Sequence, residues 1–155
     1  GKQVDSRIYP SLQKMFNDAR ASGLALFVRE GYRTAQDQQQ IMNERIRAYE
    51  NQGNSKHQAT RMVAKYVAIP GTSEHQLGLS IDINADQTKC SSEKVYRWLD
   101  NNAYKYGFIK RYPSSKSYIT GINNEPWHYR YVGKEAAATM KNQNLCLEEY
   151  LKKYK

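Results

Sequence analysis

Apolar residues recur along the chain with two different periods, and the longer period marks the helices. Between Tyr9 and Ala21 they follow the i, i+3, i+4, i+7 spacing of one helical face, and the pattern stops at Gly23. The same spacing predicts further helices from the cap Thr34 to Asn51, from the cap Ser55 to Val67, from Ser91 or Ser92 to Tyr106, over Lys134–Asn142 and over Leu147–Tyr154.

The shorter period marks the strands. Leu79, Ile81 and Ile83 alternate with polar residues, which is typical of a half-buried strand. Three more extended segments are predicted at Leu24–Arg29, Phe108–Tyr112 and Trp127–Val132. Because the helices occur in blocks and the strands are short and separated, the pattern favours an α+β fold over a doubly wound sheet. The expected architecture is a small antiparallel sheet flanked by helices.

Length and composition are those of one folded domain. The chain has 155 residues, of which 39% are hydrophobic, enough for a core. No repeat, linker or block of like charges divides it, so we expect a single domain over residues 1–155. The longest apolar run, Leu24–Val28, is far shorter than the roughly 18 residues that cross a bilayer. Because the chain begins at Gly1 without a methionine, we expect that a signal peptide or membrane anchor preceded it.

The charge balance is strongly basic, with 24 Lys and Arg against 15 Asp and Glu and a net charge of +9. Nucleic acid and bacterial cell wall are both anionic partners for such a chain, and a solvated basic surface explains the charge equally well. Lys110, Arg111 and Lys116 are expected in a solvated loop, with contact to substrate carboxylates as the alternative. Cys90 and Cys146 form no CxxC pair, which argues against a thiolate metal site but leaves both a disulfide and two free thiols open.

Two of the three histidines lie in short segments that also carry carboxylates. His75 precedes Asp82, and His128 follows Glu125. Zinc hydrolysis requires three protein ligands, an open position for water and a nearby carboxylate that takes the proton of that water. These four residues supply one group for each protein role, so the sequence suggests a metal site.

The predicted strand allows these groups to meet. Ile81 and Ile83 directed toward the core would place Asp82 on the opposite, open face of the sheet. Gly78 permits a tight turn before that strand. Pro126 interrupts regular pairing, so neighbours that face opposite ways on an ideal strand can converge. Two histidines and a carboxylate also form the facial triad of non-haem iron oxygenases, and a non-catalytic binding module stays open as well.

Three segments match known sequence signatures in the same order and spacing. SEHQLGLSIDI, which is Ser73–Ile83, is similar to SxHxxGxAxD. EPWH, which is Glu125–His128, is similar to ExxH, and GYRT at Gly31–Thr34 followed by Gln38 is similar to GYRS...Q. Together they resemble the VanY-type zinc D-alanyl-D-alanine carboxypeptidases. The chain departs from the family at Glu30, where a small residue is usual, and at Ser80, where Ala is more common.

The resemblance implies a small α+β zinc metallopeptidase and assigns a role to each matching residue. Zn²⁺ would be held by His75, Asp82 and His128, and Glu125 would be the base. The remaining matches imply that Arg33 polarises the substrate carbonyl and that Gln38 and Ser73 contact the substrate peptide. Trp127, which adjoins a ligand, is expected to pack against the site and bind substrate. The metal ligands, the catalytic residues Glu125 and Arg33, and the substrate-binding residues together make up the predicted site.

The implied activity is hydrolysis of the terminal D-Ala from peptidoglycan stem pentapeptides, or from their lipid-linked precursors, that end in D-Ala-D-Ala. Resistance to vancomycin-type antibiotics would follow, because these drugs bind that terminus. An L,D-carboxypeptidase acting on tetrapeptide stems and a D,D-dipeptidase remain alternatives. We expect a monomer at the outer face of the bacterial cytoplasmic membrane, attached only through a preceding anchor, with no nucleic-acid partner; a cytoplasmic location is the alternative.

Overall fold

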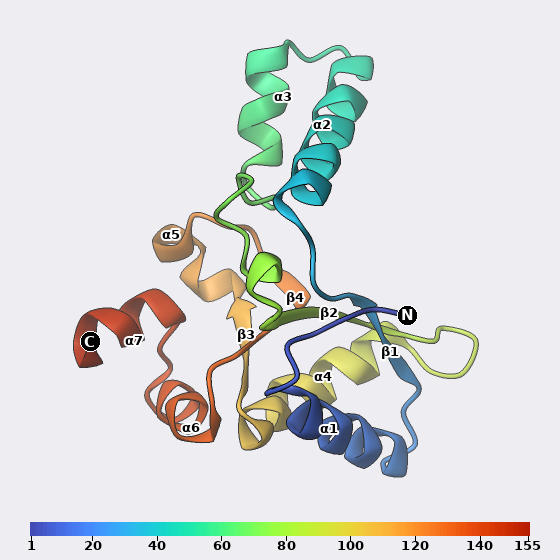
Figure 1. Cartoon of the computed structure of the whole chain (residues 1–155), viewed down its shortest axis with the longest axis vertical. Helices are drawn as coiled ribbons and strands as arrows, with labels where there is room; N and C mark the ends of the chain where they lie inside the picture. Colours follow the sequence, from blue (N-terminus) through green and yellow to red (C-terminus); the bar gives the residue numbers. More distant parts are fainter.

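The computed structural model describes all 155 residues and is built around one four-stranded antiparallel sheet with the strand order β1-β2-β4-β3 (Figure 1). The strands are β1 (Leu26–Glu30), β2 (Ser80–Ala85), β3 (Phe108–Tyr112) and β4 (Glu125–Tyr131). The helices are α1 (Tyr9–Ala21), α2 (Ala35–Asn51), α3 (Lys56–Val63), α4 (Ser92–Asn102), α5 (Ser117–Thr120), α6 (Lys134–Gln143) and α7 (Leu147–Tyr154). Three short 3-10 helices are η1 (Glu74–Leu77), η2 (Ala103–Tyr106) and η3 (Ser114–Lys116). The predicted α+β fold with a small antiparallel sheet is confirmed.

The main core lies on one face of the sheet, where α1 and α4 pack against it. Ile81 and Ile83 of the central strand β2 are fully buried there together with Met15 of α1 and Leu99 of α4. This burial of apolar side chains is the main force that holds the two helices on the sheet. None of the helices combines the length and the apolar character that a membrane crossing requires.

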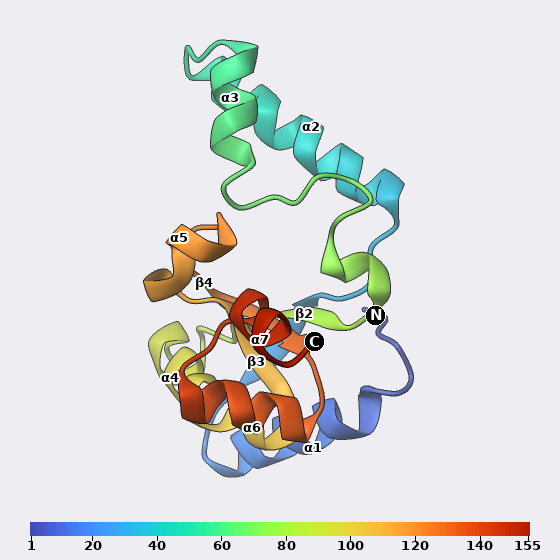
Figure 2. The ribbon, with the colours of Figure 1, turned by 90° about the vertical axis from the view of Figure 1, so that its left-hand side faces the viewer.

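The α2–α3 hairpin stands on the other side of the sheet from α1 and α4 (Figure 2). Thr34 and Ser55 cap its two helices with capping boxes, as their positions predict. A small cluster of its own, Met42 with Val63 and Val67, joins the two helices. The hairpin therefore forms a wall that faces the sheet across the site described below.

Several predicted boundaries differ from the structure. Helix α3 ends at Val63 rather than Val67, because the chain turns so that the carbonyl of Lys65 accepts a hydrogen bond from the amide of Asn123 at 2.8 Å. Strand β2 is not half-buried, since its polar residues Ser80 and Asp82 are 0% and 7% exposed. The hairpin and η1 cover the face that the alternation assigns to solvent.

The other boundary differences are smaller. Strand β1 spans Leu26–Glu30 rather than Leu24–Arg29, and β4 begins at Glu125 rather than at Trp127. The helix predicted to reach Tyr106 ends at Asn102, whose side-chain amide donates to the carbonyl of Trp98 at 2.8 Å. The chain continues from there as the 3-10 helix η2. Both cysteines are free thiols, which decides between the two alternatives that the sequence leaves open.

Candidate metal centre and active site

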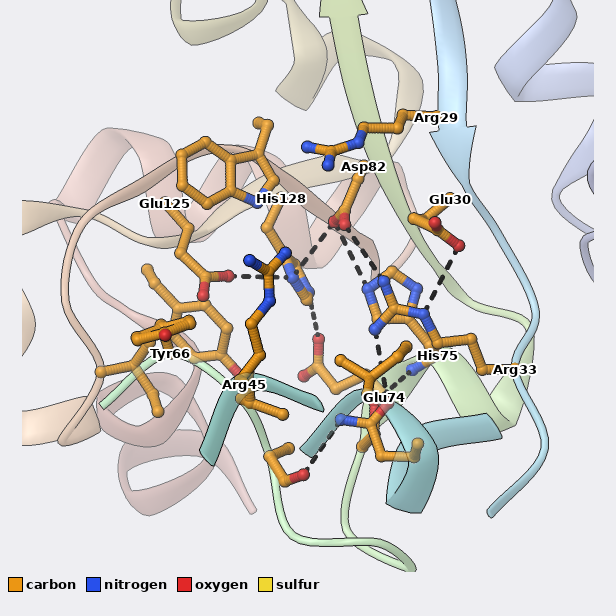
Figure 3. A pocket seen from close by; sticks show the side chains of 18 of the residues that line it. Arg29, Glu30, Arg33, Arg45, Tyr66, Glu74, His75, Asp82, Glu125 and His128 are labelled. Atoms are coloured by element: carbon orange, nitrogen blue, oxygen red, sulfur yellow. Dashed lines mark hydrogen bonds and ion pairs between the residues drawn. The ribbon is translucent and has the colours of Figure 1, made fainter. Parts of the chain in front are cut away.

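A cavity of about 450 Å³ lies between the α2–α3 hairpin and the sheet face turned away from α1 and α4 (Figure 3). The residues with a predicted role in the site all line it: Arg33, Gln38, Ser73, His75, Asp82, Glu125, Trp127 and His128. They come from the segment before α2, from α2 itself, and from η1, β2 and β4. The fold therefore brings the predicted site residues to one place.

His75 is held by the backbone so that its Nε2 faces Asp82. Its amide donates to the Ser73 hydroxyl that caps η1, at 3.3 Å. Its Nδ1 lies 2.9 Å from the carbonyl oxygen of Gly31, an acceptor, so this nitrogen carries the proton. Nε2, the other ring nitrogen, lies 3.3 Å from Oδ1 of Asp82.

Asp82 and His128 are directly opposite each other on the neighbouring strands β2 and β4. Nδ1 of His128 lies 3.5 Å from Oδ1 of Asp82. That oxygen is buried and has no hydrogen-bond partner, and a buried polar atom without a partner is costly.

The donor set fits a metal ion. His75, Asp82 and His128 offer one ligand atom each, and these atoms all lie within 4.8 Å of one another. Figure 3 shows the three side chains pointing toward one another. Two imidazole nitrogens and one carboxylate oxygen suit a divalent transition metal, and all three side chains line the cavity. A bound cation would also supply the partner that the Asp82 oxygen lacks.

A sharp turn at Gly78 connects His75 to Asp82. Gly78 has a φ of 70°, in the left-handed region, and a Cβ at this position would lie 2.9 Å from the amide nitrogen of Asp5. Asp5 in turn donates its amide hydrogen to the Gly78 carbonyl at 3.0 Å. Only glycine both adopts this φ without strain and leaves room for the Asp5 backbone, so the turn predicted from sequence has a steric cause.

Glu125 reaches the same point through an irregularity in β4. Lys110 of β3 pairs with Tyr129 and Tyr112 pairs with Glu125, so four steps along β4 oppose two steps along β3. This bulge turns Glu125 toward the face that carries His128. Oε2 of Glu125 lies 3.2 Å from Nδ1 of His128, and the residue is 5% exposed. The two residues converge as expected from Pro126, which lies within the bulged stretch.

Arg33 lies beside the metal ligands and is held from three sides. Its Nη2 is 3.6 Å from Oδ2 of Asp82 and its Nε is 3.5 Å from Oε2 of Glu30. Nη1 donates to Oε1 of Gln38 at 3.3 Å, and the Gln38 amide donates to the carbonyl of Ala68 at 3.0 Å. Gln38 thus connects the guanidinium to the loop after α3, a structural use that exists without substrate.

The structure adds site residues that the sequence reasoning missed. Arg45 lines the cavity from α2, and Arg29 does so from β1 (Figure 3). Arg45 follows Gln38 by seven positions, so it shares a helical face with a motif residue, a signal that could have found it. Glu74, next to His75, contacts His128, and no spacing rule reveals this contact.

The expectation of a solvated loop for Lys110, Arg111 and Lys116 is wrong. The Arg111 side chain is 11% exposed and pairs with Glu74 and Glu148. The exposed fraction of the Lys116 side chain is 13%. Lys110 and Lys116 also pair with carboxylates, those of Asp100 and Glu149. The partners of Arg111 and Lys116 lie more than 30 positions away, which hides these pairings from local patterns.

Comparison with known proteins gives the family. The profile of VanY, D-alanyl-D-alanine carboxypeptidase, matches residues 1–134. This chain belongs to the VanY family. A D-alanyl-D-alanine carboxypeptidase of Enterococcus faecalis (strain ATCC 700802 / V583) is 54% identical to it over 151 residues, which are 97% of this chain and 56% of that protein. The VanY-family chain described here thus spans about half the length of that relative.

Solved VanY structures agree closely with this fold. VanYB in complex with D-alanine-D-alanine has a TM-score of 0.98 at 54% identity, covering 100% of this chain and 86% of that one. A variant of the vancomycin resistance D,D-pentapeptidase VanY in complex with Zn(II) has a TM-score of 0.95 at 54% identity, covering 97% of this chain and 85% of that one. The antiparallel sheet and its helices are therefore the VanY architecture.

Charges in this VanY site favour a protonated His128 when no metal is bound. Burial opposes the charged ring, but hydrogen bonds to Glu125 and Glu74 and the nearby Asp82 carboxylate outweigh it, and they raise the pKa of His128 to about 9. Burial also opposes ionisation of Asp82, whereas His75, His128 and Arg33 lower its pKa below the usual range. A metal ion must therefore displace a proton from His128, which makes metal affinity rise with pH.

Metal-free protein is expected to lose stability as the pH rises from about 6.5 to about 9. The folded state holds the His128 proton more tightly than the unfolded chain, whose pKa is 6.5, so this stabilisation is complete below pH 6.5 and disappears through pH 9. The loss is on the order of 3 kcal/mol. Thermal unfolding of EDTA-treated protein at stepped pH measures it, and a flat or rising stability over this interval would contradict it. Metal-loaded protein, in which the ring is a neutral ligand, should not show the loss.

Proposed function

We propose that residues 1–155 form the catalytic domain of a zinc D,D-carboxypeptidase that releases the terminal D-Ala from peptidoglycan stem pentapeptides ending in D-Ala-D-Ala. The observation that carries the proposal is the convergence of His75, Asp82 and His128 around an unpartnered, buried carboxylate oxygen, with Glu125 beside them. The zinc and D-alanine-D-alanine complexes of the VanY relatives support the choice of metal and substrate.

Zinc supplies two kinds of chemistry when bound, since it lowers the pKa of a coordinated water to roughly 7 and polarises a carbonyl. Glu125 takes the proton of the attacking water and passes it to the departing amine of D-Ala. Its Oε2 lies 3.2 Å from Nδ1 of His128, a nitrogen that would bind the metal, so the carboxylate stands beside the metal site. His75, Asp82 and His128 hold the metal and take no part in proton transfer.

Arg33 stabilises the negative charge that develops on the scissile carbonyl oxygen. Its guanidinium is a permanent cation with a planar fork of donors, suited to an oxyanion. Contacts to Asp82, Glu30 and Gln38 fix its position before substrate arrives, so little reorganisation is needed during the reaction. Glu30, the unusual residue before the GYR motif, acts here as one of the groups that orient Arg33.

Substrate binding uses the rest of the cavity. Ser73 and Trp127 line it near the metal centre, and the cavity continues along α2 to Arg45. Arg29 and Arg45 offer cationic groups to the carboxylates of a stem peptide. They supply hydrogen-bond donors for the peptide in addition to those of the motif residues. A cavity of about 450 Å³ has room for residues before the terminal dipeptide.

Pentapeptide stems ending in D-Ala-D-Ala are expected to be cleaved with a kcat/KM roughly tenfold or more above that of free D-Ala-D-Ala. Contacts along α2 are available only to the longer peptide and orient the scissile bond. Chromatography of products from the dipeptide, the tetrapeptide and the pentapeptide, at equal concentrations, measures this preference. Faster cleavage of the free dipeptide would indicate a D,D-dipeptidase, and cleavage of the tetrapeptide alone would indicate an L,D-carboxypeptidase.

We further propose that the domain acts as a monomer on stem peptides, or their lipid-linked precursors, at the outer face of the bacterial cytoplasmic membrane. Mature stem peptides occur on that side of the membrane. Removal of the terminal D-Ala takes away the D-Ala-D-Ala end that vancomycin-type drugs bind, so the activity contributes to resistance. Expression of the active protein and of an inactive variant in a sensitive host, followed by measurement of vancomycin susceptibility, tests this consequence.

A further inference from the structure

Glu74 contacts the far side of a predicted metal ligand. Its Oε2 lies 3.2 Å from Nε2 of His128 (Figure 3). The Glu74 side chain is 10% exposed. The other ring nitrogen of His128, Nδ1, faces Oδ1 of Asp82 at 3.5 Å and Oε2 of Glu125 at 3.2 Å. The imidazole therefore lies between the metal centre on one side and the Glu74 carboxylate on the other.

A histidine that binds a metal through one nitrogen carries its proton on the other. An acceptor placed at that proton fixes both the tautomer and the plane of the ring. His75 receives this support from the neutral backbone carbonyl of Gly31 at 2.9 Å. His128 receives it from a carboxylate, and a hydrogen bond to a charged acceptor is the stronger of the two types.

Glu74 is itself held by donors on both oxygens. Ser80 of β2 donates its hydroxyl hydrogen to Oε2 at 2.8 Å. Oε1 accepts from Nε of Arg111 and, at 3.1 Å, from Nη1 of Arg130. With Nε2 of His128 on Oε2, each oxygen has two partners, so the carboxylate has little freedom to rotate.

The support extends to the C-terminal helix. Arg111 donates from Nη1 and Nη2 to the carboxylate of Glu148 on α7, at 2.7 and 3.1 Å. This helix lies beyond residue 134, where the match to the family profile ends. Ser80, which donates to the same carboxylate as Arg111, stands where the family signature usually has alanine.

We propose that Glu74 is a positioning residue: its carboxylate, locked by Ser80 and Arg111, holds the His128 ring so that Nδ1 faces the metal. The proposal rests on the metal site of the proposed function and adds to it a group that contacts a metal ligand, His128, and not the metal itself. Ser80 donates a hydrogen bond that alanine cannot donate, and this bond fixes the Glu74 oxygen that contacts His128.

The first test is the zinc affinity of Glu74→Gln, measured by competition with a chromophoric chelator. A carboxamide has one acceptor oxygen, so either the His128 side or the arginine side loses its partner. Affinity is expected to fall about 10- to 100-fold, as for other groups that orient metal ligands. Glu93→Gln is the matched control, because Glu93 is an exposed α4 residue paired only with Arg97; its zinc affinity should not change.

The second readout is the NMR signal of the His128 Nε2 proton in the zinc-loaded protein. We expect a downfield signal protected from exchange in the unchanged protein, and a signal shifted upfield or lost to exchange in Glu74→Gln. A purely structural role would lower the melting temperature of the metal-free variant without moving this signal or the affinity. That result would overturn the proposal.

Ser80→Ala covers the case in which Glu74→Gln does not fold. It removes one donor to Glu74, leaves every charge in place, and is expected to weaken zinc binding roughly two- to tenfold. Unchanged zinc affinity in both variants, or in Ser80→Ala when Glu74→Gln is unfolded, would overturn the positioning role. Failure of the proposed function is seen separately, because the unchanged protein would then bind no zinc or release no D-Ala.

Discussion

Glu125→Gln is expected to lower kcat for D-Ala release by about 10²- to 10⁴-fold while one zinc ion stays bound per chain. Glutamine keeps the size of the side chain but cannot take a proton from water. The metal ligands His75, Asp82 and His128 are untouched, so the ion should remain. Steady-state kinetics on a pentapeptide stem, together with metal analysis of the same sample, measures both quantities.

Glu125→Asp is the companion variant. It keeps a carboxylate but shortens its reach by one methylene, so activity should lie between that of the unchanged protein and that of Glu125→Gln. Loss of zinc together with activity would make Glu125 a ligand rather than a base. Full activity in Glu125→Gln would exclude both roles.

The sequence predicts an element of the fold correctly where neighbouring residues alone determine it. Thr34 and Ser55 cap α2 and α3 as predicted, since a cap depends only on the next three residues. The end of α3 depends on Asn123, which approaches from another part of the chain, so no local pattern predicts it. Alternation in β2 correctly directs Ile81 and Ile83 inward, but it cannot reveal that the polar face is covered too.

Motif residues were found because they stand at fixed spacings within short segments. Residues that hold the motif residues in place were not found, and Arg111 illustrates why. Its two partners, Glu74 and Glu148, each lie 37 positions away, one on either side. A largely covered cation with distant partners looks in sequence like any exposed arginine. The bulge in β4 that brings Glu125 beside His128 likewise depends on the pairing with β3. Pro126 alone indicates only that regular pairing is interrupted.

His128→Ala is expected to reduce zinc affinity by more than the roughly 10- to 100-fold expected when an orienting group is changed, because a ligand atom itself is removed. Only two ligands remain, His75 and Asp82, which leaves the ion with fewer protein bonds than a stable site provides. D-Ala release should fall with the bound zinc. Metal analysis after dialysis and chelator competition give the affinity, and the exposed His57→Ala is the matched control that should retain both.

The same variant checks the origin of the pH effect in metal-free protein. His128 is the group whose proton stabilises the fold below pH 9, so its replacement should abolish the loss of stability between pH 6.5 and pH 9. It also leaves the buried carboxylates of Asp82 and Glu125, and the part-buried one of Glu74, without their shared cation, so the variant should be less stable at pH 6.5 than the unchanged protein. Circular dichroism must first show that the variant is folded; zinc retained at full stoichiometry and affinity in folded His128→Ala would remove His128 from the ligand set.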